Sequence, residues 1–134
     1  MTMQQNLDIA QTLLKHMADH GDPTQAAALF AEDLSFEIQG DDGALPWIGR
    51  KVGRQAIVDW MHDLGSLTEP LAFDVEDVLA SESRAAVVGS LRTRIKATGK
   101  TTATQFALVL SIADGLIGRF QMLEDSFDVA RAAR

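Results

Sequence analysis

The second half of the chain alternates strand-like segments with short turn sequences, and this pattern restricts the possible folds more than any other feature. The strand-like segments cover residues 72–80, 85–97, 102–113 and 116–124. Thr98-Gly99-Lys100 and Ala113-Asp114-Gly115 separate the last three, and Asp-Gly is a strong signal for a β-hairpin. Strands joined by such short turns pair with their neighbours in antiparallel fashion. The sequence therefore predicts a four-strand antiparallel meander.

Helices are predicted on both sides of this meander. Apolar residues recur at helical spacing over residues 4–20, and Gly21 ends the segment. Asp22-Pro23 combines an N-cap residue with proline in the first turn, so a short second helix that reaches Phe30 is expected. The other predicted helices are residues 54–64, closed by Gly65, and residues 126–133.

One further strand and a long loop complete the pattern. Leu34, Phe36 and Ile38 alternate with polar residues, which is typical of a half-buried strand. Residues 39–53 hold four glycines and a proline and are expected to form a loop. Helices that precede a largely antiparallel sheet define an α+β fold. We expect a single domain over residues 1–134, in which N-terminal helices cover a curved sheet and enclose an apolar pocket within a cone.

The net charge of −7 and the absence of cysteine exclude several classes of function. An acidic chain repels phosphate groups, so we expect no nucleic-acid partner. Without cysteine, neither disulfides nor thiolate metal sites can form. The amino terminus has no signal-peptide pattern, and no apolar run approaches the roughly 20 residues that span a bilayer. We therefore expect a cytoplasmic protein that does not associate with membranes.

Four stretches of the sequence, taken in order, resemble one known superfamily. They are HGDPTQAAALFAEDLSFEI, PWIGRKVGRQAIVDWM, ATGK and IADGLIGRFQMLEDSFDVARA. The set resembles the NTF2-like superfamily, in particular its SnoaL-like proteins related to ketosteroid isomerase. The resemblance implies a curved sheet around a pocket and a homodimer formed through the outer face of the sheet. It does not imply one reaction, because the superfamily includes isomerases, dehydratases, hydrolases, cyclases and proteins without catalytic activity.

The residues that the steroid isomerases use for their reaction are missing from this chain. The position of their catalytic tyrosine falls on Leu14, and this chain contains no tyrosine. The position of their aspartate base falls on Ile38, and residues 102–113, where a second acid would lie, contain no carboxylate. The resemblance therefore argues against steroid isomerisation by the usual mechanism.

Two adjacent carboxylates, Glu124 and Asp125, are the candidate catalytic residues. Strand alternation places Glu124 on the same face as Phe120 and Met122, and this face resembles the one that lines the pocket. Burial there would raise the pKa of Glu124 and suit it to general acid or base catalysis, whereas a frayed strand end would leave it solvated. Asp125 stands where the last helix needs an N-cap, so capping competes with catalysis. SnoaL-like proteins often carry an acid followed by Ser or Thr here, which implies a pocket role.

The residues predicted to contact a ligand are almost all apolar. They are Leu14, Met17, Phe36, Ile38, Trp47, Trp60, Met61, Phe120 and Met122. Trp60 lies on the apolar face of its predicted helix, where core packing explains the pattern as well as ligand contact does. Trp47 lies in the glycine-rich loop and is expected to plug the mouth of the cone or to pack at a subunit contact. Methionines such as Met61 and Met122 suit an adaptable apolar cavity.

No cofactor and no metal are expected. His16 and His20 are four residues apart on one predicted helix, which is compatible with two metal ligands, but a third ligand is not evident. A basic cluster near the next long helix could hold an anion or pair with nearby acids. The cluster is Arg50, Lys51 and Arg54, and the nearby acids are Asp41, Asp42 and Asp59.

Three functions remain open at this point. The favoured one is an enzyme that transfers protons on a small apolar organic molecule, as an isomerase, hydratase or dehydratase, with Glu124 or Asp125 as the acid or base. The alternative is a module that binds or carries an apolar ligand without changing it. The third is a dimer that serves only as an interaction partner.

Overall fold

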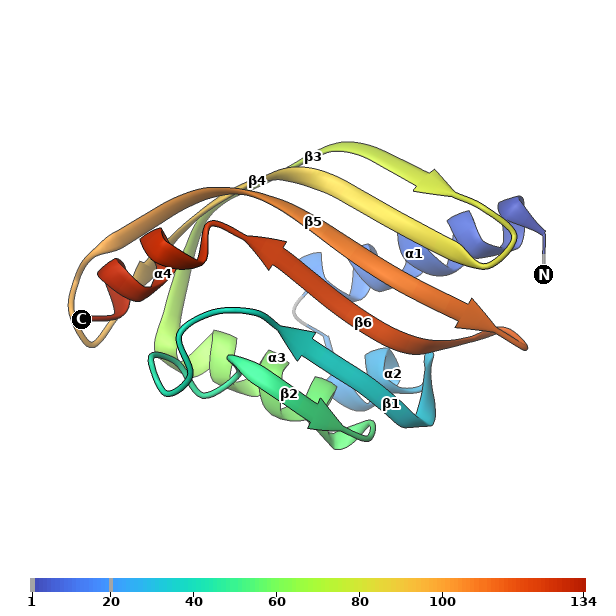
Figure 1. The fold of residues 1–134 in the computed structure, drawn as a ribbon, viewed down its shortest axis with the longest axis horizontal. Coiled ribbons are helices and arrows are strands. Elements are labelled where there is room, and N and C mark those ends of the chain that lie inside the picture. The colour runs from blue at the N-terminus through green and yellow to red at the C-terminus, as the bar shows by residue number, and fades with distance from the viewer. Residues whose placement is uncertain (1, 20) are drawn as a thin grey trace.

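The structure is a computed structural model that describes residues 2–19 and 21–134 as an α+β fold (Figure 1). Its helices are α1 (Met3–Ala18), α2 (Pro23–Ala27), α3 (Gln55–Leu67) and α4 (Ser126–Ala133). Its strands are β1 (Phe30–Ile38), β2 (Gly49–Val52), β3 (Thr68–Ala80), β4 (Arg84–Ile95), β5 (Thr101–Ala113) and β6 (Leu116–Glu124). This order confirms the predicted α+β class, with helices ahead of a meander.

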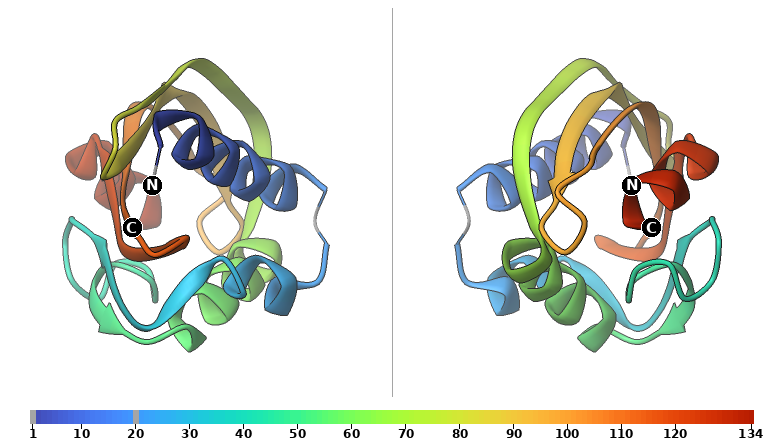
Figure 2. Two further views of the ribbon diagram at one scale, coloured as in Figure 1. Left: turned by 90° about the vertical axis from the view of Figure 1, so that its right-hand side faces the viewer. Right: turned by 90° about the vertical axis from the view of Figure 1, so that its left-hand side faces the viewer.

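The strands form one curved sheet in the order β2-β1-β6-β5-β4-β3. Strands β3 to β6 pair antiparallel with their neighbours, as the turn sequences predict. The exception in the sheet is β1, which lies parallel to β6 with Phe36 opposite Phe120. This pairing extends the meander with a strand from the first half of the chain, and the sheet then arches around α1 (Figure 2).

The two faces of the sheet differ in burial. We call the inner face the one that carries Phe106, Leu108, Phe120 and Met122, all of which are buried in the core. The outer face carries the intervening residues, such as Val109 and Gln121, which are half-buried. Helices α1 and α3 contact strands at the two ends of the sheet order, so they close the arch over the inner face (Figure 2).

The starts of the first two helices follow from their capping residues. The Thr2 hydroxyl accepts a hydrogen bond from the Gln5 amide, and the Gln5 side chain accepts one from the Thr2 amide, which together form a capping box. The Asp22 carboxylate accepts a hydrogen bond from the Thr24 amide at 2.9 Å, with Pro23 in the first turn. The N-cap predicted at Asp22 is therefore confirmed.

The sequence prediction misses the strand β2. Residues 49–52 fall within the predicted loop, but they pair antiparallel with β1, from Ile38 opposite Gly49 to Ser35 opposite Val52. The segment has no alternation of apolar and polar residues, because it is a short edge strand whose side chains are mostly exposed. Pairing with β1, rather than its own composition, holds it in the sheet.

Two predicted helix ends are also wrong. Helix α2 ends at Ala27, and Phe30 begins β1, where it is fully buried. Helix α3 continues past Gly65 to Leu67, and the next strand starts at Thr68 instead of residue 72. Pro70 is tolerated in β3 because this strand lies at the edge of the sheet and its register shifts there.

In the part of the chain that the structure describes, no helix is both long enough and apolar enough to span a membrane.

Candidate active site

Glu124 is the last residue of β6 and lies on the inner face of the sheet. The register of β5 and β6 pairs Phe106 with Glu124 and Leu108 with Met122, so Glu124 continues the row of Phe120 and Met122. The face predicted for Glu124 by strand alternation is therefore the one that the structure shows. Its neighbour across the strand pair is the ring of Phe106, which is 4% exposed.

The carboxylate of Glu124 has an apolar setting and no polar partner among the described residues. It forms no hydrogen bond and no ion pair within residues 2–19 and 21–134. Burial alone raises the pKa of Glu124 from 4.5 to about 7. A carboxyl group with this pKa can accept or release a proton near neutral pH, which is what general acid–base catalysis needs.

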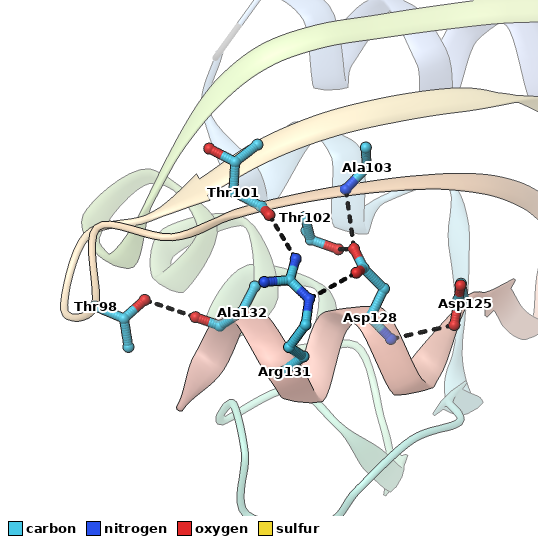
Figure 3. A network of polar contacts seen from close by, with 8 residues as sticks. All are labelled: Thr98, Thr101, Thr102, Ala103, Asp125, Asp128, Arg131 and Ala132. Carbon is cyan, nitrogen blue, oxygen red and sulfur yellow. Dashed lines mark hydrogen bonds and ion pairs between the residues drawn. The ribbon is translucent and has the colours of Figure 1, made fainter.

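Asp125 occupies the N-cap of α4. Its carboxylate accepts a hydrogen bond from the amide of Asp128 at 3.1 Å (Figure 3). Its own amide donates to the hydroxyl of Thr104 at 2.7 Å. The side chain is exposed and satisfies a free helix amide, as the capping interpretation predicts. Asp125 therefore caps α4 at the position directly after Glu124.

Helix α4 is fastened to the edge of β5 beyond the end of β6. The Asp128 carboxylate accepts hydrogen bonds from the Thr102 hydroxyl at 2.7 Å, the Ala103 amide at 3.1 Å and Arg131 Nε at 2.9 Å (Figure 3). Arg131 also donates to the Thr101 carbonyl. The hydrogen bonds from Arg131 and then Thr102 lower the pKa of Asp128 to about 2. These bonds hold the start of α4 in place directly after Glu124.

We expect Asp125→Ala to lower the free energy of unfolding by about 1 kcal/mol, because the amide of Asp128 loses its acceptor. Asp125→Ser should retain most of the stability, since serine is also a good N-cap residue. Thermal unfolding of both variants measures the effect. If Asp125→Ala instead keeps full stability but abolishes ligand turnover, Asp125 acts in catalysis and the cap is incidental.

Four aromatic side chains form a cluster on the inner face, and three of them are among the predicted ligand contacts. The rings of Phe36 and Phe120 are stacked with centroids 4.9 Å apart, and Trp60 meets Phe120 edge-on at 5.2 Å. Phe30 completes the cluster, with its centroid 6.2 Å from that of Phe120. Each ring is buried, so these side chains bind one another in the core. Their contact with a ligand stays a prediction.

The other predicted contact residues lie around this cluster. Ile38 and Met122 are buried beside each other in the paired strands β1 and β6. Leu14, Met17 and Met61 are half-buried on α1 and α3 and pack against the core. Trp47 lies in the loop before β2 and is 6% exposed.

Trp47 and Trp60 border a surface hollow of about 200 Å³ next to α3. The other residues that line it are Pro46, Lys51, Ala56, Asp59 and Asp63. The lining therefore combines two tryptophans with charged residues of both signs. Neither Glu124 nor Phe106 is among the residues that line this hollow.

The structure adds inner-face residues on the three strands that follow β6 in the sheet, which the sequence did not identify. They are Phe106 on β5, Gly89 on β4, and Phe73 and Val75 on β3. Alternation over residues 102–113 groups Phe106 with Leu108 and Leu110, and that signal was present in the sequence. The position of Phe73 and Gly89 beside Phe106 depends on the register between strands, which one sequence does not specify.

Arg50 and Arg54 of the basic cluster near α3 pair with groups other than the predicted acids. Arg50 pairs with Glu37 of β1, and this hydrogen bond is the main reason that the pKa of Glu37 is lowered. Arg54 donates to the Phe30 carbonyl at 2.7 Å and lies 3.9 Å from Glu32. Asp41, an expected partner of this cluster, instead forms an ion pair with Arg134.

Residues 2–19 and 21–134 contain no group of three or more acidic or histidine side chains that could hold a metal ion. Of the predicted pair His16 and His20, His20 lies outside the described residues.

The comparisons with known proteins agree with this architecture. Residues 10–120 match the model of the SnoaL-like domain family. The chain is similar to an NTF2-like protein from Burkholderia xenovorans LB400, with a TM-score of 0.89 and 23% identity over 100% of this chain and 99% of that one. It is also similar to a "Putative Isomerase" from Rhodopseudomonas palustris, with a TM-score of 0.78 and 18% identity over 99% and 98% of the two chains.

A third similar structure is a "putative polyketide cyclase" from Xanthomonas campestris pv. campestris, with a TM-score of 0.75 and 16% identity over 98% of each chain. None of the curated proteins compared with the chain matches it. The fold is thus that of the NTF2-like superfamily, an open cone of curved sheet and helices. Within that class, the chain belongs to the SnoaL-like domain family.

Proposed function

We propose that this protein is an acid–base enzyme that transfers protons on a small apolar organic molecule, with Glu124 as the acid or base. The observation that carries the proposal is the partly buried Glu124 carboxylate on the inner face, which has no polar partner among the described residues. Leaving a carboxylate without a partner in an apolar setting destabilises a fold, so such a group is a candidate for function.

The surroundings of Glu124 support a particular kind of chemistry. Phe106 and Met122 are buried next to Glu124 in the sheet, so the carboxylate lies beside apolar side chains that keep water away from a substrate bound to it. A pKa of about 7 leaves both the protonated and the ionised form of Glu124 available at neutral pH. Similar structures named for an isomerase and a polyketide cyclase are consistent with this chemistry, at 18% and 16% identity.

The choice of Glu124 over Asp125 follows from their contacts. Asp125 is exposed and already accepts a hydrogen bond from the helix it caps, whereas Glu124 is free to meet a substrate. The proton transfer we propose assigns the acid–base role to the Glu124 carboxylate and invokes no metal and no cofactor. We retain the cytoplasmic location as a prediction.

Proton exchange tests the proposal without knowledge of the natural substrate. A panel of apolar ketones that includes 2-tetralone is incubated in D2O with the protein, and exchange of the protons next to the carbonyl is followed by NMR. We expect protein-dependent exchange with an inflection in its pH profile near 7. Glu124→Gln should slow it by about 100- to 10,000-fold.

One variant serves as the control, and two results would contradict the proposal. Asp125→Ser preserves the cap and should exchange protons at close to the wild-type rate. If ketones bind but are recovered without any exchange, the protein is a carrier or binding module. Exchange that is equal in the wild type and in Glu124→Gln would remove Glu124 from the mechanism.

We also propose that the protein forms a homodimer through the outer face of the sheet. Val88 and Val109 lie on this face, and Leu79 is 53% exposed beside them at the edge strand. Asp74 and Arg92 border an outer-face hollow of about 320 Å³, and their opposite charges could pair across a two-fold axis.

Light scattering during size-exclusion chromatography tests the dimer. We expect a dimer for the wild type and a monomer for Val109→Lys, because a lysine would be buried without a partner at the interface. Gln11→Lys adds the same charge to the exposed surface of α1 and should remain dimeric. A monomeric wild type at about 100 μM would contradict the proposal.

A further inference from the structure

The pairing of strands β5 and β6 ends at Glu124 itself. The last pair in their register is Phe106 with Glu124, and β5 extends beyond this pair, from Gln105 back to Thr101. The backbone that follows Glu124 therefore has no partner in the sheet ladder. A strand end of this kind opens easily unless another group binds it. The group that closes the end of β6 thus decides whether Glu124 stays in its apolar setting.

The hydroxyl group of Thr104 closes this strand end in place of a backbone carbonyl. It accepts a hydrogen bond from the amide of Asp125 at 2.7 Å and donates its own proton to the carbonyl of Gln105 at 2.7 Å. Because its one hydrogen is already donated, a lone pair of the oxygen is available to the amide. The Asp125 amide belongs to the planar peptide unit that joins it to Glu124, so the bond fixes the backbone directly beside this residue.

Thr104 is a polar residue in a buried row of β5. Along the inner face, Leu108, Phe106 and Thr104 follow one another, and each is at most 7% exposed. A buried hydroxyl group costs free energy unless it is hydrogen-bonded, and Thr104 meets this need with its two bonds. Valine has the same shape without the hydroxyl, so shape alone does not account for threonine here. The bond to Asp125 does.

We propose that Thr104 is a positioning residue of the active site, whose hydroxyl keeps the end of β6 closed and so holds the Glu124 carboxyl group among apolar side chains. This inference rests on the proposed function of Glu124 and adds a residue that acts through Glu124 without touching the substrate. Among the described residues, the Glu124 side chain makes no hydrogen bond and no ion pair. Its place is therefore set by the backbone that carries it and by packing.

The charged groups that follow Glu124 in the chain have other partners. Asp125 uses its carboxylate to cap α4, and the carboxylate of Asp128 binds to β5 and to Arg131. None of these groups holds the Glu124 side chain when the strand end opens. If the Asp125 amide loses its acceptor, water reaches the Glu124 carboxyl group and favours its ionised form.

NMR titration of the Glu124 side-chain carboxyl carbon tests this role without any substrate. In the wild type, burial raises the pKa of Glu124 from 4.5 to about 7. In Thr104→Val, which keeps the shape and loses the hydroxyl, we expect this pKa to fall to about 6 or below. Thr104→Ser keeps the hydroxyl and should titrate like the wild type. A wild-type titration in Thr104→Val would overturn the positioning role.

Thr102→Val is the matched control. Thr102 lies on the same strand, is 3% exposed, and donates its hydroxyl proton to the carboxylate of Asp128 at 2.7 Å (Figure 3). The substitution removes a buried hydroxyl beside α4 but leaves the bond to the Asp125 amide in place, so Glu124 should titrate as in the wild type. An equal fall of the pKa in both valine variants would mean that general loosening of α4 controls Glu124, and would overturn the role of Thr104.

Hydrogen exchange of the wild type keeps the proposal testable if Thr104→Val does not fold. We expect the Asp125 amide to exchange at least about 100-fold more slowly than in an unfolded chain, because the Thr104 hydroxyl binds it. The amides of Ser126 and Phe127 lie in the first turn of α4, where helix amides have no partner within the helix, and should exchange faster. An Asp125 amide that exchanges as fast as these two would contradict the proposal.

Proton exchange on 2-tetralone separates this role from the proposed function. If Glu124 is the acid or base, Thr104→Val should slow the exchange by about 10- to 100-fold and move its inflection to lower pH, and Thr104→Ser should restore both. If Glu124→Gln leaves exchange unchanged, the proposed function fails, while the NMR titration still decides whether Thr104 positions Glu124. If Glu124 is essential but Thr104→Val titrates and exchanges like the wild type, the function stands and the positioning role is wrong.

Discussion

Glu124→Gln is expected to be more stable than the wild type, and increasingly so as the pH rises. The raised pKa means that the folded protein holds the Glu124 proton more tightly than the unfolded chain does. The bound proton therefore stabilises the folded state. This stabilisation is fully present below the unfolded pKa of 4.5 and is lost as the pH rises through the folded pKa of about 7. Glutamine resembles the protonated acid in shape and has no charge, so the variant avoids the loss.

The size of the effect follows from the pKa difference. Above pH 7 the ionised carboxylate should cost the wild type about 3 kcal/mol of unfolding free energy, and at pH 5.5 about 1 kcal/mol. Urea unfolding of the wild type and Glu124→Gln at pH 5.5 and pH 8 measures the difference. Every other group titrates alike in the two proteins, so the comparison isolates Glu124.

Glu82→Gln provides the matched control, since Glu82 is exposed in the turn between β3 and β4. We expect it to show no such pH-dependent gain. Parallel stability curves for the wild type and Glu124→Gln across this range would mean that Glu124 is solvated in solution, and the proposed function would lose its main support. A gain in stability together with a loss of proton exchange would be the result typical of a catalytic group in an apolar site.

Gly89→Ala is expected to be among the most destabilising single substitutions in this chain. A Cβ at residue 89 would overlap the carbonyl oxygen of Asp74 and lie 3.1 Å from Cε1 of Phe106. The overlapped atom belongs to the backbone of β3, so the strand pair itself must shift. We expect the free energy of unfolding to fall by about 3 kcal/mol or more, at the upper end for an overpacked site.

Gly118→Ala offers a direct control for this substitution. Gly118 lies in β6, and a Cβ there would meet no heavy atom within 4 Å. Its stability should stay within about 0.5 kcal/mol of the wild type or rise slightly, because alanine restricts the unfolded chain. Equal effects of the two substitutions in urea unfolding would show that β3 does not approach β4 closely at Gly89.

Local sequence signals were sufficient for the elements with strong turn or capping chemistry. Asp114 and Gly115 both have positive φ angles, 53° and 79°, as the Asp-Gly hairpin signal requires. Asp22 caps α2 and Asp125 caps α4, each at the residue that the sequence indicated. In these cases the residues that decide the conformation are adjacent in the chain.

The prediction failed where packing overrides local preference. Gly65 is the predicted end of α3, but the helix continues because α3 packs its apolar side against the core and glycine disfavours a helix by only about 1 kcal/mol. Strand β2 could not be found from its own sequence, since Gly49–Val52 has no alternation and is held by its pairing with β1.

By itself, the sequence determined the α+β order, the turns of the meander and the face on which Glu124 lies, because periodicity, glycine and capping residues act over a few residues. The tertiary structure alone decided which side chains surround Glu124. The approach of Phe73 to Phe106 depends on the register of three strands and on the missing side chain of Gly89. Register is fixed by the packing of the whole sheet, and it is this packing that places Phe106 opposite Glu124.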